Sequence, residues 1–131
     1  MGYLPPFEVL KKNLKLSSIK GKLYVNLEYE EFLKLLKLLL RAVEVDDAWY
    51  MDVYPDVAQA VRSGQFRSAK HHFLEVGYFE GRRPKELEVD EAWYLKTNED
   101  VSEGIRQGIF PSAAAHFIAH GYDEGRLPSE F

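Results

Sequence analysis

The strongest pattern of hydrophobic and polar positions lies in residues 26–43, NLEYEEFLKLLKLLLRAV. Apolar side chains recur there at the three- and four-residue spacing of one helical face, with charged residues opposite. This predicts a long amphipathic helix that starts at Asn26 as its N-cap. Leu35, Leu38 and Ala42 widen the apolar stripe beyond what one core-facing side usually needs. Either the helix is central and packed on both flanks by the rest of the chain, or its extra edge is a surface for a partner or for self-association.

Two weaker elements are predicted before this helix. FEVLKKNLKL places Phe7, Leu10 and Leu14 on one helical face, and SSIKGKLYVN reads as two short strands joined at Lys20-Gly21. A lone two-stranded hairpin is only marginally stable in water. Pairing edge to edge with a second chain would support it and would also cover the wide stripe.

An internal repeat organises the rest of the chain. A shift of 44 residues aligns residues 44–84 with 88–128, with 21 identical residues at 41 positions. Unrelated segments of this composition would share roughly two or three. Each copy holds signals for three short helices, so residues 44–86 and 87–131 are expected to form two stacked helical repeats after an N-terminal region, residues 1–43. The predicted fold is mainly α, with a small β-hairpin near the N-terminus.

Most repeated positions have a structural interpretation. Aspartates are expected at helix starts, glycines at helix ends, and a His-Phe pair on the inward stripe of the third helix. These positions are Asp46, Asp56, Gly64, His72, Phe73, Gly77 and Gly81 in the first copy, and Asp90, Asp100, Gly108, His116, Phe117, Gly121 and Gly125 in the second. The second helix of each copy is predicted to start at Pro55 or Asn98, and the third at Ser68 or Ser112. Arg82 and Arg126 could bond exposed helix carbonyls or pair with Asp56 and Asp100.

Composition and charge narrow the function classes. The chain is 46% apolar with a net charge of −4, which is typical of a globular protein and argues against nucleic-acid binding. It has no cysteine, so disulfides and thiolate chemistry are excluded. No uninterrupted apolar run is longer than four residues. We therefore expect no membrane span, no signal peptide and a cytoplasmic protein.

Candidate chemistry is sparse. His116 and His120 have a four-residue spacing that could hold one metal ion, but Val76 occupies the second position in the first copy. No nucleophile–base pattern, phosphate loop or dinucleotide motif is present. We expect neither an enzyme nor a metal or other cofactor.

Repeated aromatic residues beside arginines are the stronger binding signal. One ring of each Trp-Tyr pair can face the core while its neighbour faces solvent, although core packing alone would also explain both. The predicted partner-binding residues are Leu35, Leu38 and Ala42 of the long helix and Trp49, Tyr50, Tyr54, Arg82, Trp93, Tyr94 and Arg126 of the repeats.

VDDAWYMDVYPDV, HHFLEVGYFEGRRP, VDEAWYLKTNEDV and AHFIAHGYDEGRLP resemble a bacterial tandem helical repeat. Such repeats are appended to glycosyltransferases and secreted calcium-binding proteins and occur in small uncharacterised proteins. The resemblance covers about two thirds of the chain and implies no catalytic residues. Glu99 stands where the repeat pattern has proline.

Together these patterns predict a non-catalytic protein–protein interaction module, an adaptor or accessory subunit that forms a homodimer through residues 23–43. The alternative is recognition of a carbohydrate or glycan-linked peptide by the aromatic and arginine faces of the repeats. A third class, an acidic regulator that docks on a basic protein, fits the net charge but has no motif.

Overall fold

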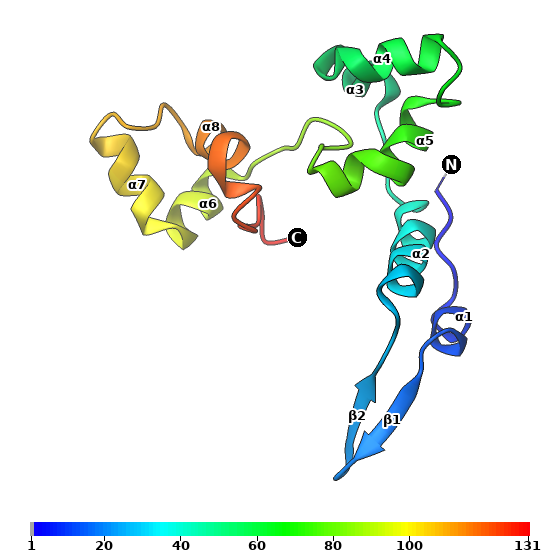
Figure 1. Ribbon diagram of the computed structural model, residues 1–131. Helices are drawn as coiled ribbons and strands as arrows, with labels where there is room; N and C mark the ends of the chain where they lie inside the picture. Colours follow the sequence, from blue (N-terminus) through cyan, green and yellow to red (C-terminus); the bar gives the residue numbers. More distant parts are fainter. Residues whose placement is uncertain (1) are drawn as a thin grey trace. The chain divides into compact units, whose positions relative to one another are not determined.

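The computed structural model describes residues 2–131 and is mainly helical, with one two-stranded antiparallel hairpin, as predicted (Figure 1). The chain divides into two compact units, Met1–Lys85 and Glu86–Phe131. The N-terminal region therefore shares one unit with the first repeat, and the second repeat forms the other. Stacking of the two repeats on each other stays a prediction.

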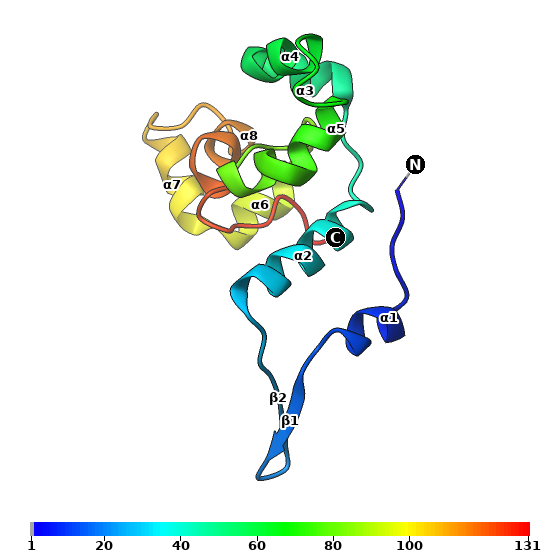
Figure 2. The ribbon, with the colours of Figure 1, turned by 45° about the vertical axis from the view of Figure 1, so that its right-hand side comes forward.

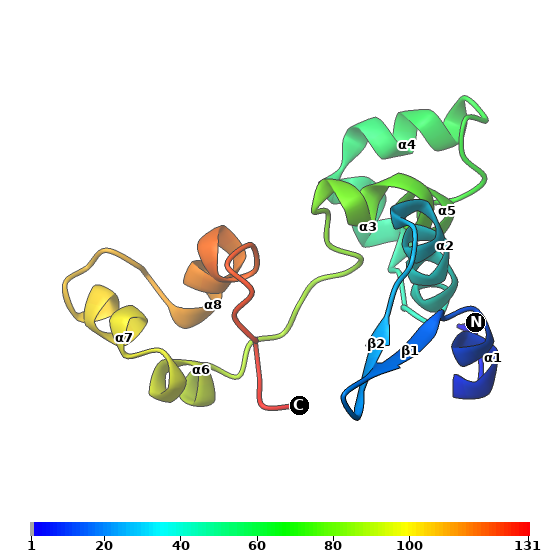
Figure 3. The same ribbon diagram turned by 60° about the horizontal axis from the view of Figure 1, so that its bottom comes forward.

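The first unit begins with α1 (Phe7–Lys12), β1 (Leu16–Ile19), β2 (Lys22–Val25) and α2 (Tyr29–Leu40). The predicted hairpin is confirmed, with Leu16 opposite Val25 and Ile19 opposite Lys22. Its two turn residues, Lys20 and Gly21, have φ angles of 51° and 78°. Two successive positive φ values match the twist of the flanking strands, which is why Gly follows Lys here. The hairpin lies at the end of this unit that is remote from α4 (Pro55–Arg62), as Figures 2 and 3 also show.

The predicted N-cap of the long helix at Asn26 is wrong. Glu28 occupies that position, without a side-chain capping bond. Asn26 instead extends the hairpin, because its N–H donates to the carbonyl of Lys15 over 3.1 Å. The other end of α2 packs against the first repeat, where Lys37 Nζ lies 3.0 Å from Glu75 Oε2 and Leu40 is buried.

The first repeat contains α3 (Asp47–Val53), α4, α5 (Ala69–His72), the π-helical turn η1 (Phe73–Gly77) and the short η2 (Tyr78–Glu80). Leu40 joins its core of Tyr50, Val57, Ala69 and Phe73. The N-caps at Asp46 and Ser68 are confirmed by side-chain bonds to Trp49 N and His71 N. Pro55 opens α4 as predicted, and Gly64 follows its end with a φ of 80°.

The second repeat contains α6 (Glu91–Thr97), α7 (Glu99–Arg106), α8 (Ala113–His116) and η3 (Phe117–Gly121) around Tyr94, Val101, Ala113 and Phe117. Asp90 and Ser112 cap their helices, and Gly108 ends α7 with a φ of 76°. Asn98 stands at the predicted start of α7, but its side chain does not cap the helix. Its amide group donates to Tyr94 O and accepts from Arg126 Nη1, both over 2.9 Å.

The helical segments η1 and η3 end at Gly77 and Gly121, as predicted, but neither glycine has the left-handed conformation of a helix C-cap. Gly77 has a right-handed φ of −60°, and the left-handed end falls later, at Gly81 with a φ of 80° and at Gly125 with 78°. Gly77 is required for space instead. A Cβ atom there would overlap the hydroxyl of Tyr50, and a Cβ atom at Gly121 would overlap the hydroxyl of Tyr94.

A backbone bond closes each repeat on itself. The N–H of Asp46 donates to Pro84 O, and the N–H of Asp90 donates to Pro128 O, both over 3.0 Å. The final proline of the repeated GYxEGRxP segment therefore lies beside the first helix of its own repeat. This segment is part of the repeat's fold.

Candidate interaction surface

The N-terminal region presents an unusual amount of apolar surface. Among residues 2–43, only Pro5 and Leu40 are buried. Both strands of the hairpin are exposed along their full length, and Leu23 is 73% exposed. The large exposed apolar side chains of this region are Tyr3, Leu4, Phe7, Val9, Leu16, Ile19, Leu23, Tyr24, Val25, Tyr29 and Phe32. We call this set the N-terminal apolar surface; large exposed apolar surface is typical of an interaction site.

An apolar cavity of about 250 Å³ lies between α1, β2 and α2. Its walls carry Phe7, Leu10 and Leu14, although Leu14 lies beyond the end of α1 at Lys12 and so is not on the predicted helical face. Phe32, Leu35 and Leu39 of α2 close the other side, and Val25 connects the cavity to the hairpin. The elements of this region thus pack loosely around their own apolar residues and leave many of them open to solvent.

The three residues predicted to bind a partner through the long helix have different environments, and Ala42 lies beyond the end of α2 at Leu40. Leu35 is half-buried and lines the cavity just described. Leu38 is half-buried beside Arg41, Arg67 and Leu74, and only Ala42 is exposed. The larger exposed surface lies on the hairpin and the start of α2, at Leu23, Tyr24, Tyr29 and Phe32. These four residues were not among the predicted partner-binding residues. The apolar residues of the predicted hairpin were the sequence signal that could have identified this surface.

Charge is distributed unevenly along the sequence. Residues 1–43 contain eight Lys and Arg against four Asp and Glu, whereas residues 44–131 contain nine against 17. The N-terminal region is therefore basic by four charges and the repeats are acidic by eight. The stretch from Val9 to Leu27 contains five lysines and no acidic residue.

The prediction that Tyr50 and Tyr94 of the repeats bind a partner is wrong. Each is 0% exposed, so neither can contact a partner. The hydroxyl of Tyr50 lies 2.9 Å from His72 Nδ1, and Tyr94 and His116 are joined in the same way. Both pairs join residues 22 positions apart. Each pair therefore satisfies the polar atoms of two large buried rings, as buried polar groups require.

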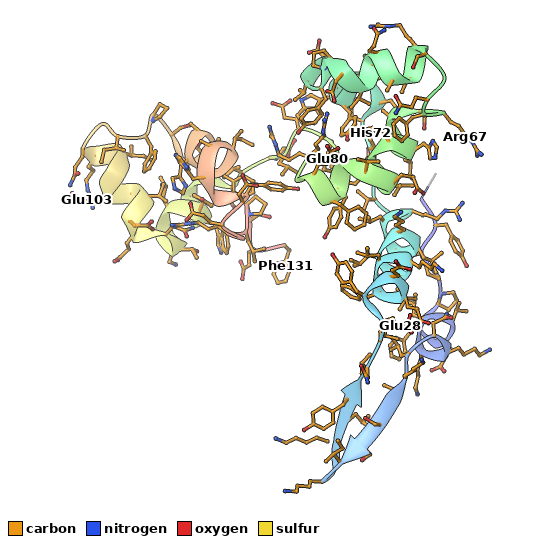
Figure 4. The ribbon with its side chains drawn as sticks, in the orientation of Figure 1. Glu28, Arg67, His72, Glu80, Glu103 and Phe131 are labelled. Carbon is orange, nitrogen blue, oxygen red and sulfur yellow. The ribbon has the colours of Figure 1, made fainter. Side chains whose placement is uncertain are left out.

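Burial sets the protonation of these pairs. It raises the pKa of both tyrosines and lowers the pKa of both histidines, with nearby Arg82 and Arg126 lowering the histidine pKa further. His72 Nε2 faces Glu80 Oε1 at 3.9 Å (Figure 4). A hydrogen on Nε2 is favoured there, so the Tyr50 hydroxyl donates a hydrogen bond to Nδ1 of the neutral ring.

The two repeat arginines are held inside their own repeats. Arg82 donates to both carboxylate oxygens of Asp56 over 2.9 and 2.7 Å, and Arg126 does the same to Asp100. The sequence left two roles open for these arginines, bonds to helix carbonyls or pairing with aspartates. In the structure both arginines pair with aspartates. The pairing lowers the pKa of both aspartates. The Arg82 guanidinium also lies over the Tyr54 ring at 4.9 Å, so these donors are engaged within the chain and not open to a ligand.

The remaining aromatic residues are partly covered. Trp49 and Trp93 are half-buried against the cores of their repeats, and Tyr54 is half-buried beside Trp49 and Arg82. The Tyr54 hydroxyl accepts from the N–H of Arg83 over 3.0 Å. These rings stabilise the repeat in the way that core packing predicts.

The histidine pair tested as a metal site contributes to packing. His116 is buried against Tyr94 and Phe110, while His120 is exposed with its ring centroid 5.6 Å from that of His116. Within residues 2–131, no group of three or more His, Asp or Glu side chains is placed to hold a metal ion.

Comparisons with known proteins found no matching protein-family model, no matching curated protein and no matching solved structure. Over residues 2–131, the helices are too short and too polar for any of them to cross a membrane.

Proposed function

We propose that this protein is a non-catalytic interaction module, an adaptor or accessory subunit, that self-associates through residues 23–43. The observation that carries the proposal is the N-terminal apolar surface. Tyr29 and Phe32 at the start of α2 are 73% and 46% exposed, and the adjoining hairpin has no buried residue. Side chains of this size gain most when a partner removes them from water.

A stable interface would also stabilise the hairpin, which has little packing around it. Two strands without a covered face are marginal in isolation, and specific interfaces bury about 800 Å² on each partner. The hairpin, the cavity beside it and the start of α2 supply exposed apolar side chains for that purpose. In this proposal the repeats act as a scaffold, since their most distinctive polar residues bond to one another.

Solution mass measured by light scattering over a concentration series tests this function. The wild type is expected to approach twice 15.2 kDa as concentration rises. A Leu23→Glu, Phe32→Glu variant is expected to remain a monomer with an unchanged helical spectrum, because both residues are exposed in the isolated chain. Ile109→Glu is the matched control, since Ile109 is an exposed apolar residue of the second repeat, 63% exposed.

A wild type that stays monomeric throughout would overturn self-association. A dimer that the double variant leaves intact would move the interface away from residues 23–43. Loss of the dimer in Ile109→Glu but not in the double variant would place it on the second repeat.

A further inference from the structure

The hairpin has one edge that is ready for pairing. Bonded and non-bonded residue pairs alternate along an antiparallel ladder. Asn26 bonds to Lys15, and Ile19 and Lys22 flank the two-residue turn, so Lys22, Tyr24 and Asn26 direct their backbone groups toward β1. Leu23 and Val25 therefore direct their N–H and C=O groups away from it. Within the described residues the sheet has only these two strands, so these outward groups have no strand beside them.

We propose that the self-associated form pairs β2 with β2 of a second copy, antiparallel, about a two-fold axis at Tyr24. The result is a four-stranded sheet with the order β1-β2-β2-β1. This proposal rests on the proposed function and specifies which edge and which register carry it.

The outward groups decide the register. Pairing about Tyr24 brings Leu23 of each copy opposite Val25 of the other, so all four outward groups of each strand find partners within Lys22–Val25. A two-fold axis at Leu23 would instead pair Val25 with Gly21 of the turn. An axis at Val25 would pair Leu23 with Leu27, which lies beyond the strand. Only the Tyr24 axis uses both outward residues inside the strand.

Charge decides between the two edges of the hairpin. About the Tyr24 axis, the turn of one copy, which carries Lys20, points toward Glu28 of the other, where the chain passes from the hairpin into α2 (Figure 4). The basic turn of each copy thus meets the acidic start of the other copy's α2, which also carries Glu30 and Glu31. Pairing through β1 has no such match, because no acidic residue lies between Val9 and Leu27.

Side-chain faces agree with this pairing. Leu16 lies opposite Val25, and Leu23 is two residues from Val25, so these three aliphatic residues share one face of the hairpin. Two copies would join six of them into one apolar face. Val25 also lines the cavity between α1 and α2, so that face continues into the apolar surface of the helices.

Single-cysteine cross-linking tests the register, and the chain has no cysteine to interfere. Under mild oxidation, Tyr24→Cys is expected to give a disulfide-linked dimer, because opposed residues at a non-bonded pair lie within disulfide reach. Ser17→Cys is the matched control. Ser17 lies directly opposite Tyr24 in the hairpin, but three strand spacings, about 14 Å, would separate the two copies of Ser17.

Each outcome is informative. A cross-linked dimer for Tyr24→Cys and not for Ser17→Cys supports the proposal, and the reverse would assign the contact to β1. A light-scattering dimer with neither cross-link, or with one at Leu38→Cys only, would overturn strand pairing and leave the proposed function standing. A wild-type monomer would overturn both.

A proline variant gives a second test that does not depend on oxidation. Val25→Pro removes an outward N–H and leaves the bonds between β1 and β2 in place, and proline is tolerated at such edge positions. We expect its dimer dissociation constant to rise about ten-fold or more, with the helical spectrum retained. An unchanged constant would contradict pairing through β2.

Discussion

At the scale of single residues, the repeat is maintained by partners that lie 22 and 26 positions apart. Tyr50 bonds to His72, and Arg82 bonds to Asp56, with equivalent pairs in the second copy. Gly77 completes this arrangement by leaving room for the Tyr50 hydroxyl. The duplicated residues therefore need no ligand to explain why they recur.

A double-mutant cycle tests the glycine. Gly77→Ala is expected to lower the free energy of unfolding by about 1–3 kcal/mol, because the new methyl group would overlap the Tyr50 hydroxyl. Tyr50→Phe alone is expected to cost about 1–2 kcal/mol by leaving His72 without its partner. The double variant should cost less than the sum, since the next atoms lie 3.2 Å or more from the Cβ position. Strictly additive costs in urea unfolding would contradict this account.

The buried histidines give stability a pH dependence. Burial lowers the pKa of His72 and His116 in the folded chain below the ordinary value of 6.5, so the unfolded chain binds their protons more readily. Their contribution is complete above about pH 6.5 and is lost as pH falls toward the lowered values, by at most about 1.4 kcal/mol per pH unit for each histidine. The aspartates paired with Arg82 and Arg126 act at lower pH, below their ordinary pKa of 3.8.

Urea unfolding between pH 8 and pH 5 measures this slope. A His72→Gln, His116→Gln variant should be less stable at pH 8 and should show a flatter profile in the same window. Wild-type stability that stays constant or rises as pH falls through 6.5 would contradict the assignment.

At the scale of elements, the sequence predicted much more of the repeats than of their surroundings. The caps at Asp46 and Ser68 and the left-handed Gly64 follow from local chemistry, and all three are confirmed. Gly77 was misjudged because its neighbour, Tyr50, lies 27 residues earlier in the chain, and no local pattern reports that contact. Asn26 was misjudged because a ladder bond to Lys15 prevailed over a weak capping preference.

The candidate site was harder to predict for a related reason. The repeated Trp-Tyr and Arg positions look like a binding face in sequence, but the burial of Tyr50 and the aspartate partner of Arg82 depend on tertiary packing. Conversely, Leu23 is exposed because the hairpin has no third strand beside it within residues 2–131, and the alternation of KLYV does not specify this.

A charge exchange at the hairpin tests how this element pairs. Lys20→Glu is expected to raise the dimer dissociation constant about three- to ten-fold at low salt, because it brings like charges near each other at both ends of the strand pair. Adding Glu28→Lys should restore most of the affinity. Lys12→Glu changes net charge equally and serves as the control in sedimentation equilibrium. A double variant as weak as Lys20→Glu alone would contradict the Tyr24 register.

At the scale of the whole molecule, the repeats and the N-terminal region are expected to have different roles. Each repeat closes on itself through its own proline carbonyl and its own arginine–aspartate pair. The N-terminal region has little core of its own and carries the most exposed apolar side chains of the chain apart from the terminal residue, Leu23 and Tyr29, both 73% exposed. Association and folding of the hairpin are therefore expected to be coupled.

Amide hydrogen exchange of the wild type, measured below and above the concentration of association, tests the central claim most directly. The account predicts that protection increases with concentration across residues 16–40, including the amides of Leu23 and Val25, and stays constant across residues 44–131. Protection that changes only in the repeats, or that is independent of concentration throughout the chain, would contradict it.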